Sequence, residues 1–100
     1  MKEFRDLILK GSFDEAYKLF QNMKLKDVCD TIISISFDTK NMLAYGFIMY
    51  SLMRNETIEL HSIASSILMN SYVDIEGAGI LAYNHVKRAI EIDNNSLIHT

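Results

Sequence analysis

Hydrophobic residues recur along most of this chain three or four residues apart, which is the spacing of an amphipathic helix. The clearest run is Phe13, Ala16, Tyr17 and Phe20, which predicts a helix over residues 13–23. Weaker forms of the same pattern predict five further helices, over residues 2–10, 25–37, 39–54, 55–71 and 75–92. Proline is absent and glycine occurs only four times. A chain with so few helix breakers favours long helices joined by short turns.

Polar residues and glycine mark where these helices start and stop. Gly11 ends the first helix, and Ser12 followed by Glu15 is the pattern of a capping box at the start of the second. Asp38 is the expected N-cap of the fourth helix, because a short side-chain oxygen can accept from the first free amides. The run Asp93–Asn95 is expected to close the last helix.

Residues 31–37 also fit a strand. They alternate in polarity and are rich in β-branched side chains, which favours extended backbone. Helix is the preferred interpretation, because no partner strand is visible elsewhere in the sequence.

The helix over residues 39–54 is predicted to be the buried centre of the fold, because apolar residues cover nearly its whole circumference. Met42, Met49 and Met53 belong to that helix, and Met69 belongs to the next. Methionine can line an adaptable binding surface or fill irregular gaps in a core. We expect these four side chains to fill the core.

Composition limits the classes to which the chain can belong. It has 100 residues, 49% of them hydrophobic, a formal net charge of −3 and one cysteine. This length fits one domain over residues 1–100, and the hydrophobic content excludes disorder. One cysteine excludes a disulfide framework and a Cys-rich zinc module. A negative chain is a poor binder of nucleic acid through its phosphates.

The expected location is the cytoplasm. The longest stretches without charged residues, 41–53 and 60–73, fall short of the ~20 apolar residues that span a bilayer. The N-terminus has no signal-peptide pattern, and the free Cys29 fits a reducing compartment.

Two segments share a pattern. Gly11–Met23 can be laid on Gly77–Ala89 with matching small and apolar positions, at an offset of 66 residues. This resembles the second helix of a tetratricopeptide repeat, whose period is ~34 residues. The middle unit that this period implies, near Gly46, does not show the pattern. We therefore predict an all-α, tetratricopeptide-like bundle of about six helices in antiparallel hairpins; a six-helix bundle without true repeats is the alternative.

No motif indicates catalysis. His61, His85 and His99 lack the spacing of a metal-binding helix, although His61 and His85 lie on adjacent predicted helices and could meet. Cys29 lies on an apolar face, and no glycine-rich phosphate loop is present. We expect no catalytic residue, no metal, no cofactor and no enzyme activity.

One charge feature points to a partner. Residues 55–86 contain four acids and no lysine or arginine, whereas the other 68 residues sum to +1. An acidic face edged by tyrosine suits a basic protein partner, although acids also gather at helix N-termini for electrostatic reasons. The candidate interface residues are Glu56, Glu59, Tyr72, Asp74, Glu76 and His85.

Similarity to a known family lies in the C-terminal third, in the stretches His61–Asn70, Asp74–Ala78 and Leu81–Ser96. These stretches resemble small helical immunity proteins of bacterial polymorphic toxins, including those of contact-dependent growth inhibition systems. The resemblance implies a cytosolic antitoxin without catalytic residues. Such a protein binds one cognate toxin domain and blocks its activity. Here the toxin domain is expected to be basic, for example a nuclease. The alternative is a tetratricopeptide-like adaptor that binds peptide segments of several partners.

Overall fold

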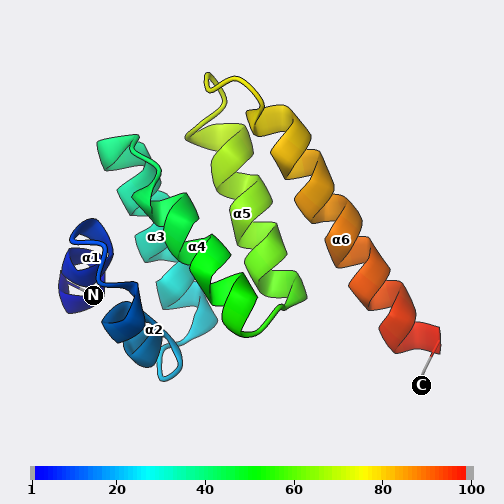
Figure 1. Cartoon of the computed structure of the whole chain (residues 1–100), viewed down its shortest axis with the longest axis horizontal. Helices are drawn as coiled ribbons and strands as arrows, with labels where there is room; N and C mark the ends of the chain where they lie inside the picture. Colours follow the sequence, from blue (N-terminus) through cyan, green and yellow to red (C-terminus); the bar gives the residue numbers. More distant parts are fainter. Residues whose placement is uncertain (1, 99–100) are drawn as a thin grey trace.

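Six α-helices make up all the regular secondary structure in residues 2–98, the part of the chain that this computed structural model describes (Figure 1). Their bounds are α1 Lys2–Leu9, α2 Phe13–Phe20, α3 Leu25–Thr39, α4 Leu43–Arg54, α5 Ile58–Asn70 and α6 Ala78–Ile98. The all-α prediction is confirmed. The strand considered for residues 31–37 is not formed, since these residues lie inside α3.

The helices are arranged from α1 and α2 at one end of the molecule to α6 at the opposite edge, with α3, α4 and α5 between them (Figure 1). Helices α4, α5 and α6 run alternately in opposite directions, so α5 and α6 form an antiparallel hairpin. Helix α6 packs along α5 over much of its length. No helix among residues 2–98 is both long and apolar enough to cross a membrane.

The core has an aromatic centre on α4. The Phe47 ring is buried and stands 5.4 Å from Phe4, 5.7 Å from Phe13 and 6.0 Å from Phe20, measured between ring centroids. The pairs with Phe4 and Phe13 are edge-to-face and the pair with Phe20 is tilted; aromatic pairs add about 0.5–1.5 kcal/mol each to the burial of the rings. Phe47 therefore joins the first two helices to the rest of the fold.

The prediction that Asp38 caps the fourth helix is wrong. Helix α3 continues through Asp38, whose carboxylate accepts a hydrogen bond from Arg5 of α1 at 3.3 Å. The chain leaves α3 at Lys40, which has a left-handed φ of 55°. Asn41 then accepts from the Leu43 amide at 3.0 Å, so Asn41 supplies the polar contact expected of Asp38.

The capping box predicted at Ser12 and Glu15 does not form, because the Ser12 side chain makes no capping hydrogen bond. The Ser12 amide instead donates to the Leu7 carbonyl and the Gly11 amide to Ile8, which is a Schellman ending of α1. Ser12 thus helps to end α1 through its amide, while its carbonyl accepts from the Ala16 amide at 3.0 Å at the start of α2.

The last helix begins and ends later than predicted. Helix α6 starts at Ala78, after Gly77 with φ of 90°, and runs through Asp93–Asn95 to Ile98. The polar run at 93–95 therefore does not end it. The helix predicted over residues 55–71 begins at Ile58, with Thr57 as its N-cap. The Thr57 hydroxyl accepts from the Leu60 amide at 3.2 Å.

The methionines predicted to fill the core lie at the surface instead. Met42, Met49, Met53 and Met69 are all exposed, and Met53 is 86% exposed. Helix α4 buries only one side, through Ala44, Phe47, Ile48 and Ser51. A helix covered by apolar residues all round is thus only half buried here.

The internal pattern has a structural counterpart. Gly11 and Gly77 both adopt a left-handed φ just before the second helix of a hairpin, at 77° and 90°. Ala16 and Ala82 occupy equivalent positions in α2 and α6, and both are buried. The shared sequence pattern therefore marks the same two features, a tight entry turn and a close approach between helices.

Replacing Gly77 by alanine should lower the free energy of unfolding by about 1–2 kcal/mol, since only glycine adopts the left-handed region without strain. An added methyl group meets nothing within 4 Å, so the loss would come from the backbone alone. Urea unfolding followed by circular dichroism measures it. The matched control is Gly79→Ala, which also meets nothing but lies in α6 without a positive φ, and should leave stability unchanged or slightly higher. Equal losses in both variants would contradict this account.

Candidate functional site

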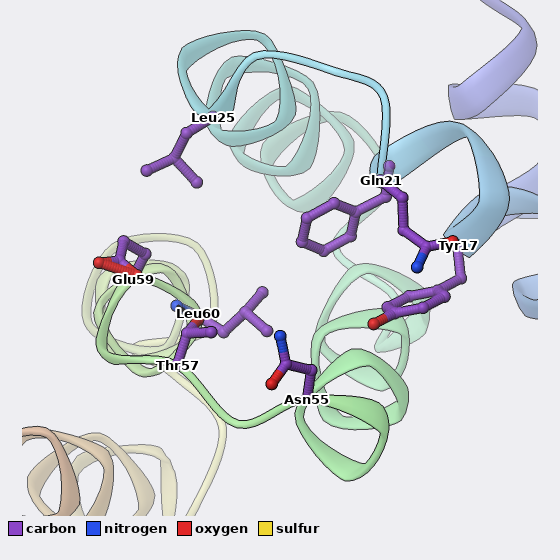
Figure 2. A pocket seen from close by; sticks show the side chains of 8 residues that line it. Tyr17, Gln21, Leu25, Asn55, Thr57, Glu59 and Leu60 are labelled. Carbon is purple, nitrogen blue, oxygen red and sulfur yellow. Dashed lines mark hydrogen bonds between the residues drawn. The ribbon is translucent and has the colours of Figure 1, made fainter. Parts of the chain in front are cut away.

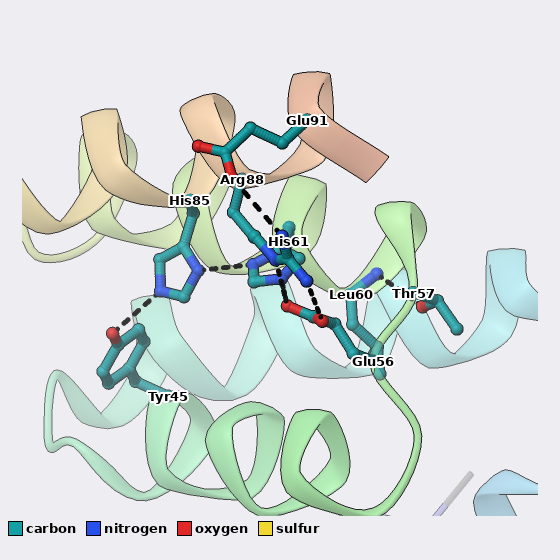
Figure 3. A network of polar contacts seen from close by, with 8 residues as sticks. All are labelled: Tyr45, Glu56, Thr57, Leu60, His61, His85, Arg88 and Glu91. Carbon is teal, nitrogen blue, oxygen red and sulfur yellow. Dashed lines mark hydrogen bonds and ion pairs between the residues drawn. The ribbon is translucent and has the colours of Figure 1, made fainter. Parts of the chain in front are cut away.

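A chain of polar side chains ties together α4, α5 and α6 (Figure 3). It begins at Tyr45 on α4, passes through His85 on α6 and His61 on α5, and ends at Glu56, which lies just before α5. His61 and His85 are each only 7% exposed. Two imidazoles from different helices therefore meet inside the protein.

Each contact in this series of side chains has the length of a hydrogen bond. The Tyr45 hydroxyl lies 2.9 Å from His85 Nε2, and the two Nδ1 atoms of His85 and His61 lie 2.8 Å apart. His61 Nε2 lies 2.8 Å from Glu56 Oε2. These are ordinary hydrogen-bond lengths, so both ring nitrogens of both histidines have partners.

Glu56 is held from the other side by Arg88 of α6. Arg88 Nε and Nη2 donate to the two oxygens of Glu56, each at 2.9 Å, and Nη1 donates to Glu91 at 3.3 Å. The bonds from Arg88, and next the bond from His61, lower the pKa of Glu56 from 4.5 to about 2. Glu56 is therefore a carboxylate at any pH near neutral.

When both histidines are neutral, the ionised state of Glu56 determines which atom carries the hydrogen in each of these hydrogen bonds. A carboxylate only accepts, so His61 Nε2 carries the hydrogen and His61 Nδ1 must accept. His85 Nδ1 then donates to it, which leaves His85 Nε2 to accept from the Tyr45 hydroxyl. Burial raises the pKa of Tyr45, so this hydroxyl keeps its proton. All the hydrogen bonds therefore point one way, from α4 towards Glu56.

The neutral state of His85 has a physical cause. Burial, and next the charge of His61, lower the pKa of His85 below 6.5. A buried imidazolium lacks water to stabilise its charge. The site thus favours a neutral imidazole at His85.

The hydrogen bonds described above occupy both histidines of this network, which are almost closed to solvent. Cys29 lies apart on α3, and burial raises the pKa of its thiol above 9.0, which keeps it protonated and weakly nucleophilic. Within the described residues, no three side chains of His, Cys, Asp or Glu are placed to share a metal ion.

Two of the predicted interface residues, Glu56 and His85, are brought together in this network. Glu59, Asp74 and Glu76 are exposed and lie outside it. The expectation that Tyr72 and His85 lie at a surface is wrong. Tyr72 is 1% exposed and its hydroxyl donates to the Asn41 carbonyl, because α5 ends against the turn after α3.

Sequence reasoning missed Tyr45 and Arg88. Arg88 lies three residues after His85, so the two share a face of α6, and this spacing was the available signal. Nothing in the sequence pairs Tyr45 with a residue 40 positions away.

A separate surface hollow of ≈ 400 Å³ lies where the end of α2 faces the starts of α3 and α5 (Figure 2). Its lining is Tyr17, Phe20, Gln21, Leu25, Asn55, Thr57, Glu59 and Leu60. The side-chain amides of Gln21 and Asn55 point into the opening. The predicted interface residue Glu59 thus stands at the edge of a mixed apolar and polar hollow.

Comparisons of the chain with protein-family models, with curated proteins and with solved structures each found no match.

Glu56→Gln should lower the free energy of unfolding at pH 7 by about 1 kcal/mol, because an amide has one acceptor oxygen where Glu56 uses two, so a donor of Arg88 would face the amide nitrogen. The pKa of Glu56 is lowered to about 2 in the folded state, so its stabilisation is complete above pH 4.5 and is lost as pH falls towards 2. The difference between wild type and variant should shrink over that range. Denaturant unfolding at a series of pH values measures it.

Glu59→Gln is the control, since Glu59 is exposed and makes no hydrogen bond or ion pair within residues 2–94. It should change stability by less than about 0.5 kcal/mol. If the two variants behave alike, the network does not stabilise the fold.

Proposed function

We propose that this chain is an immunity protein, which binds one cognate toxin domain in a stoichiometric complex and blocks its activity. The observation that carries the proposal is a row of exposed apolar side chains on α6, in a hairpin whose free charges are mainly acidic. The resemblance of the C-terminal third to such proteins agrees with it.

The row consists of Tyr83, Val86 and Ile90, which follow one side of α6 at intervals of three and four residues. Their side chains are 66%, 46% and 56% exposed. Contiguous apolar surface on a small protein is typical of a contact with another protein. We refer to these three residues as the α6 row.

The internal repeat indicates what kind of contact the α6 row makes. Tyr17 and Phe20 of α2 are the residues 66 positions before Tyr83 and Val86. They pack against aromatic rings of α4 at centroid distances of 6.1 and 6.0 Å. The equivalent side of α6 has no such helix within the described residues. We infer that a helix of the partner lies along α6 as α4 lies along α2.

A shallow hollow beside the row offers a place for an anchoring side chain. It measures ≈ 250 Å³ and lies between α5 and α6. Its lining is Ile58, Ser62, Val86, Ala89, Ile90 and Asp93. One apolar side chain of the partner helix would fill it, with a basic neighbour placed against Asp93.

Charge favours a basic partner. Residues 58–94 contain five acids and two bases, and one of those bases, Arg88, is already bound to Glu56 and Glu91. The exposed Glu59, Asp74 and Glu76 make no ion pair within residues 2–94. A toxin that acts on nucleic acid must attract phosphate and is therefore basic, so an acidic inhibitor can cover its site.

Coexpression with the product of the gene immediately upstream tests the proposal. Growth rescue together with a one-to-one complex on copurification is the expected result. Weak binding to several unrelated peptides would favour the adaptor alternative. Failure of both rescue and complex formation would overturn the immunity function.

Val86→Glu should weaken the complex about 30-fold, which corresponds to ~2 kcal/mol and is the size expected for a central apolar contact. Leu81→Glu is the matched control: Leu81 is 41% exposed on the same helix, but five residues away and therefore on another side of it. The control should bind within about threefold of wild type in titration calorimetry. Equal losses would show that the α6 row is not a specific contact.

Reversing Asp74 and Glu76 to lysine should slow association about tenfold at low salt and flatten its dependence on ionic strength, because exposed charges act mainly on the rate of encounter. Stopped-flow or surface plasmon resonance kinetics measure both. Unchanged association rates would exclude steering by these two acids.

A further inference from the structure

We propose that the buried pair of His61 and His85 attaches α6 to α4 and α5 in a pH-dependent way. The pair accommodates one added proton, and a second proton releases α6 from α4 and α5. The release is a property of the free chain. Its consequence for partner binding rests on the function proposed above, because α6 also carries the α6 row.

The first added proton costs no hydrogen bond. Placed on His85 Nε2, it reverses only the bond to Tyr45, whose hydroxyl can rotate and accept instead of donating. His85 Nδ1 still donates to His61 Nδ1, and His61 still donates to Glu56. The positive charge then lies on His85, which two successive hydrogen bonds connect through His61 to the carboxylate of Glu56.

The second added proton has no place in this geometry. It would put a hydrogen on both Nδ1 atoms, which face each other across 2.8 Å, so two donors would meet with no acceptor between them. Two imidazolium rings would also stand with centroids 5.1 Å apart in a site almost closed to solvent. Burying two like charges without a compensating partner is strongly unfavourable.

Among the described side chains, the charged groups beside the pair can offset one added positive charge but not the second. From α4 the pair faces only the neutral hydroxyl of Tyr45, and from the segment before α5 it faces Glu56. Arg88 of α6 is shared between Glu56 and Glu91, so these three groups carry one net negative charge, which can balance one imidazolium but not two. Helix α3 also packs on α5, but within the described residues it sends no hydrogen bond or ion pair to this cluster.

Helix α6 is the element that would move, because little apolar surface holds it. The hydrophobic residues of α6 buried within the described side chains are Ala78 and Ala82, which are small. Ala89 and Ile92 are half-buried, and the other large ones are exposed, namely Ile80, Leu81, Tyr83, Val86 and Ile90. Burial stabilises in proportion to apolar area, so the network through His85 carries an unusual share of the attachment of α6.

The sign of the pH effect follows from His85. Its pKa is lowered in the folded state, so the unfolded or released chain takes up protons at pH 6.5 that the folded chain resists. The attachment of α6 is therefore complete above pH 6.5 and weakens as pH falls below it. This window lies above that of Glu56, whose contribution is lost only between pH 4.5 and about 2.

Hydrogen exchange of the free wild-type protein at pH 7.5 and pH 5.0, corrected for the intrinsic exchange rate, tests the proposal. We expect amide protection in α6 to fall at least tenfold at pH 5.0, while protection in α4 around Phe47 changes less than threefold. Unchanged protection of α6, or an equal loss in all helices, would overturn the release of α6.

Two variants separate titration of the pair from simple damage to it. His85→Asn cannot gain a proton, so protection of α6 should become independent of pH, even if it is lower at both values. Tyr45→Phe is the control, because it removes one hydrogen bond but keeps both imidazoles, and it should retain the pH effect. A pH effect that persists in His85→Asn would overturn the proposal.

If His85→Asn does not fold, the wild type still decides the question by ¹⁵N NMR of its imidazole rings. The expected signals at pH 7.5 are a hydrogen on Nε2 of His61 and on Nδ1 of His85, with the second protonation coinciding with loss of α6 protection. Two rings that titrate independently at ordinary pKa values would overturn it. Because these experiments use the free protein, their failure leaves the immunity function standing, and a failed rescue test leaves them unaffected.

Discussion

The contact between the two Nδ1 atoms of His61 and His85 is the constraint on which the attachment of α6 depends. It forms only while the pair lacks at least one proton, and it joins the first turn of α5 to α6. Glu56 makes it directional by accepting from His61, and Arg88 keeps Glu56 ionised. A surface ion pair thus sets the protonation of a buried one-way hydrogen-bond chain.

This dependence explains an unusual distribution of side chains on α6. Its buried face holds alanines and a histidine, while tyrosine and branched apolar residues point outward. A helix that packs for stability alone would place those residues the other way round. The polar network attaches α6 with little apolar area, and that frees its larger side chains for a contact outside the chain. Because the attachment of α6 relies on this polar network, it is sensitive to protonation of the two histidines.

Helical periodicity predicted the existence and order of all six helices, because apolar spacing reflects which face packs on a neighbour. The ends were less predictable. Asp38 has the chemistry of an N-cap, but Arg5 of α1 engages it inside α3, and α1 lies more than 30 residues away in sequence. Ser12 likewise has capping chemistry, yet its amide completes the turn that ends α1. Local rules fail where a distant or preceding element uses the same atoms.

The acidic segment, residues 55–86, shows that prediction of a binding surface from sequence meets the same limit. The sequence gives the number of charges, but it does not show which of them already have partners within the fold. Glu56 belongs to the segment by composition, yet it accepts from Arg88 and His61 and so acts within the fold. Glu59, Asp74 and Glu76 have no such partner in residues 2–94. A field that attracts a basic protein must arise from charges not already balanced within the chain. The acidic surface available to a partner is therefore smaller than the segment that revealed it, and it lies at the two ends of the α5–α6 hairpin rather than along its length.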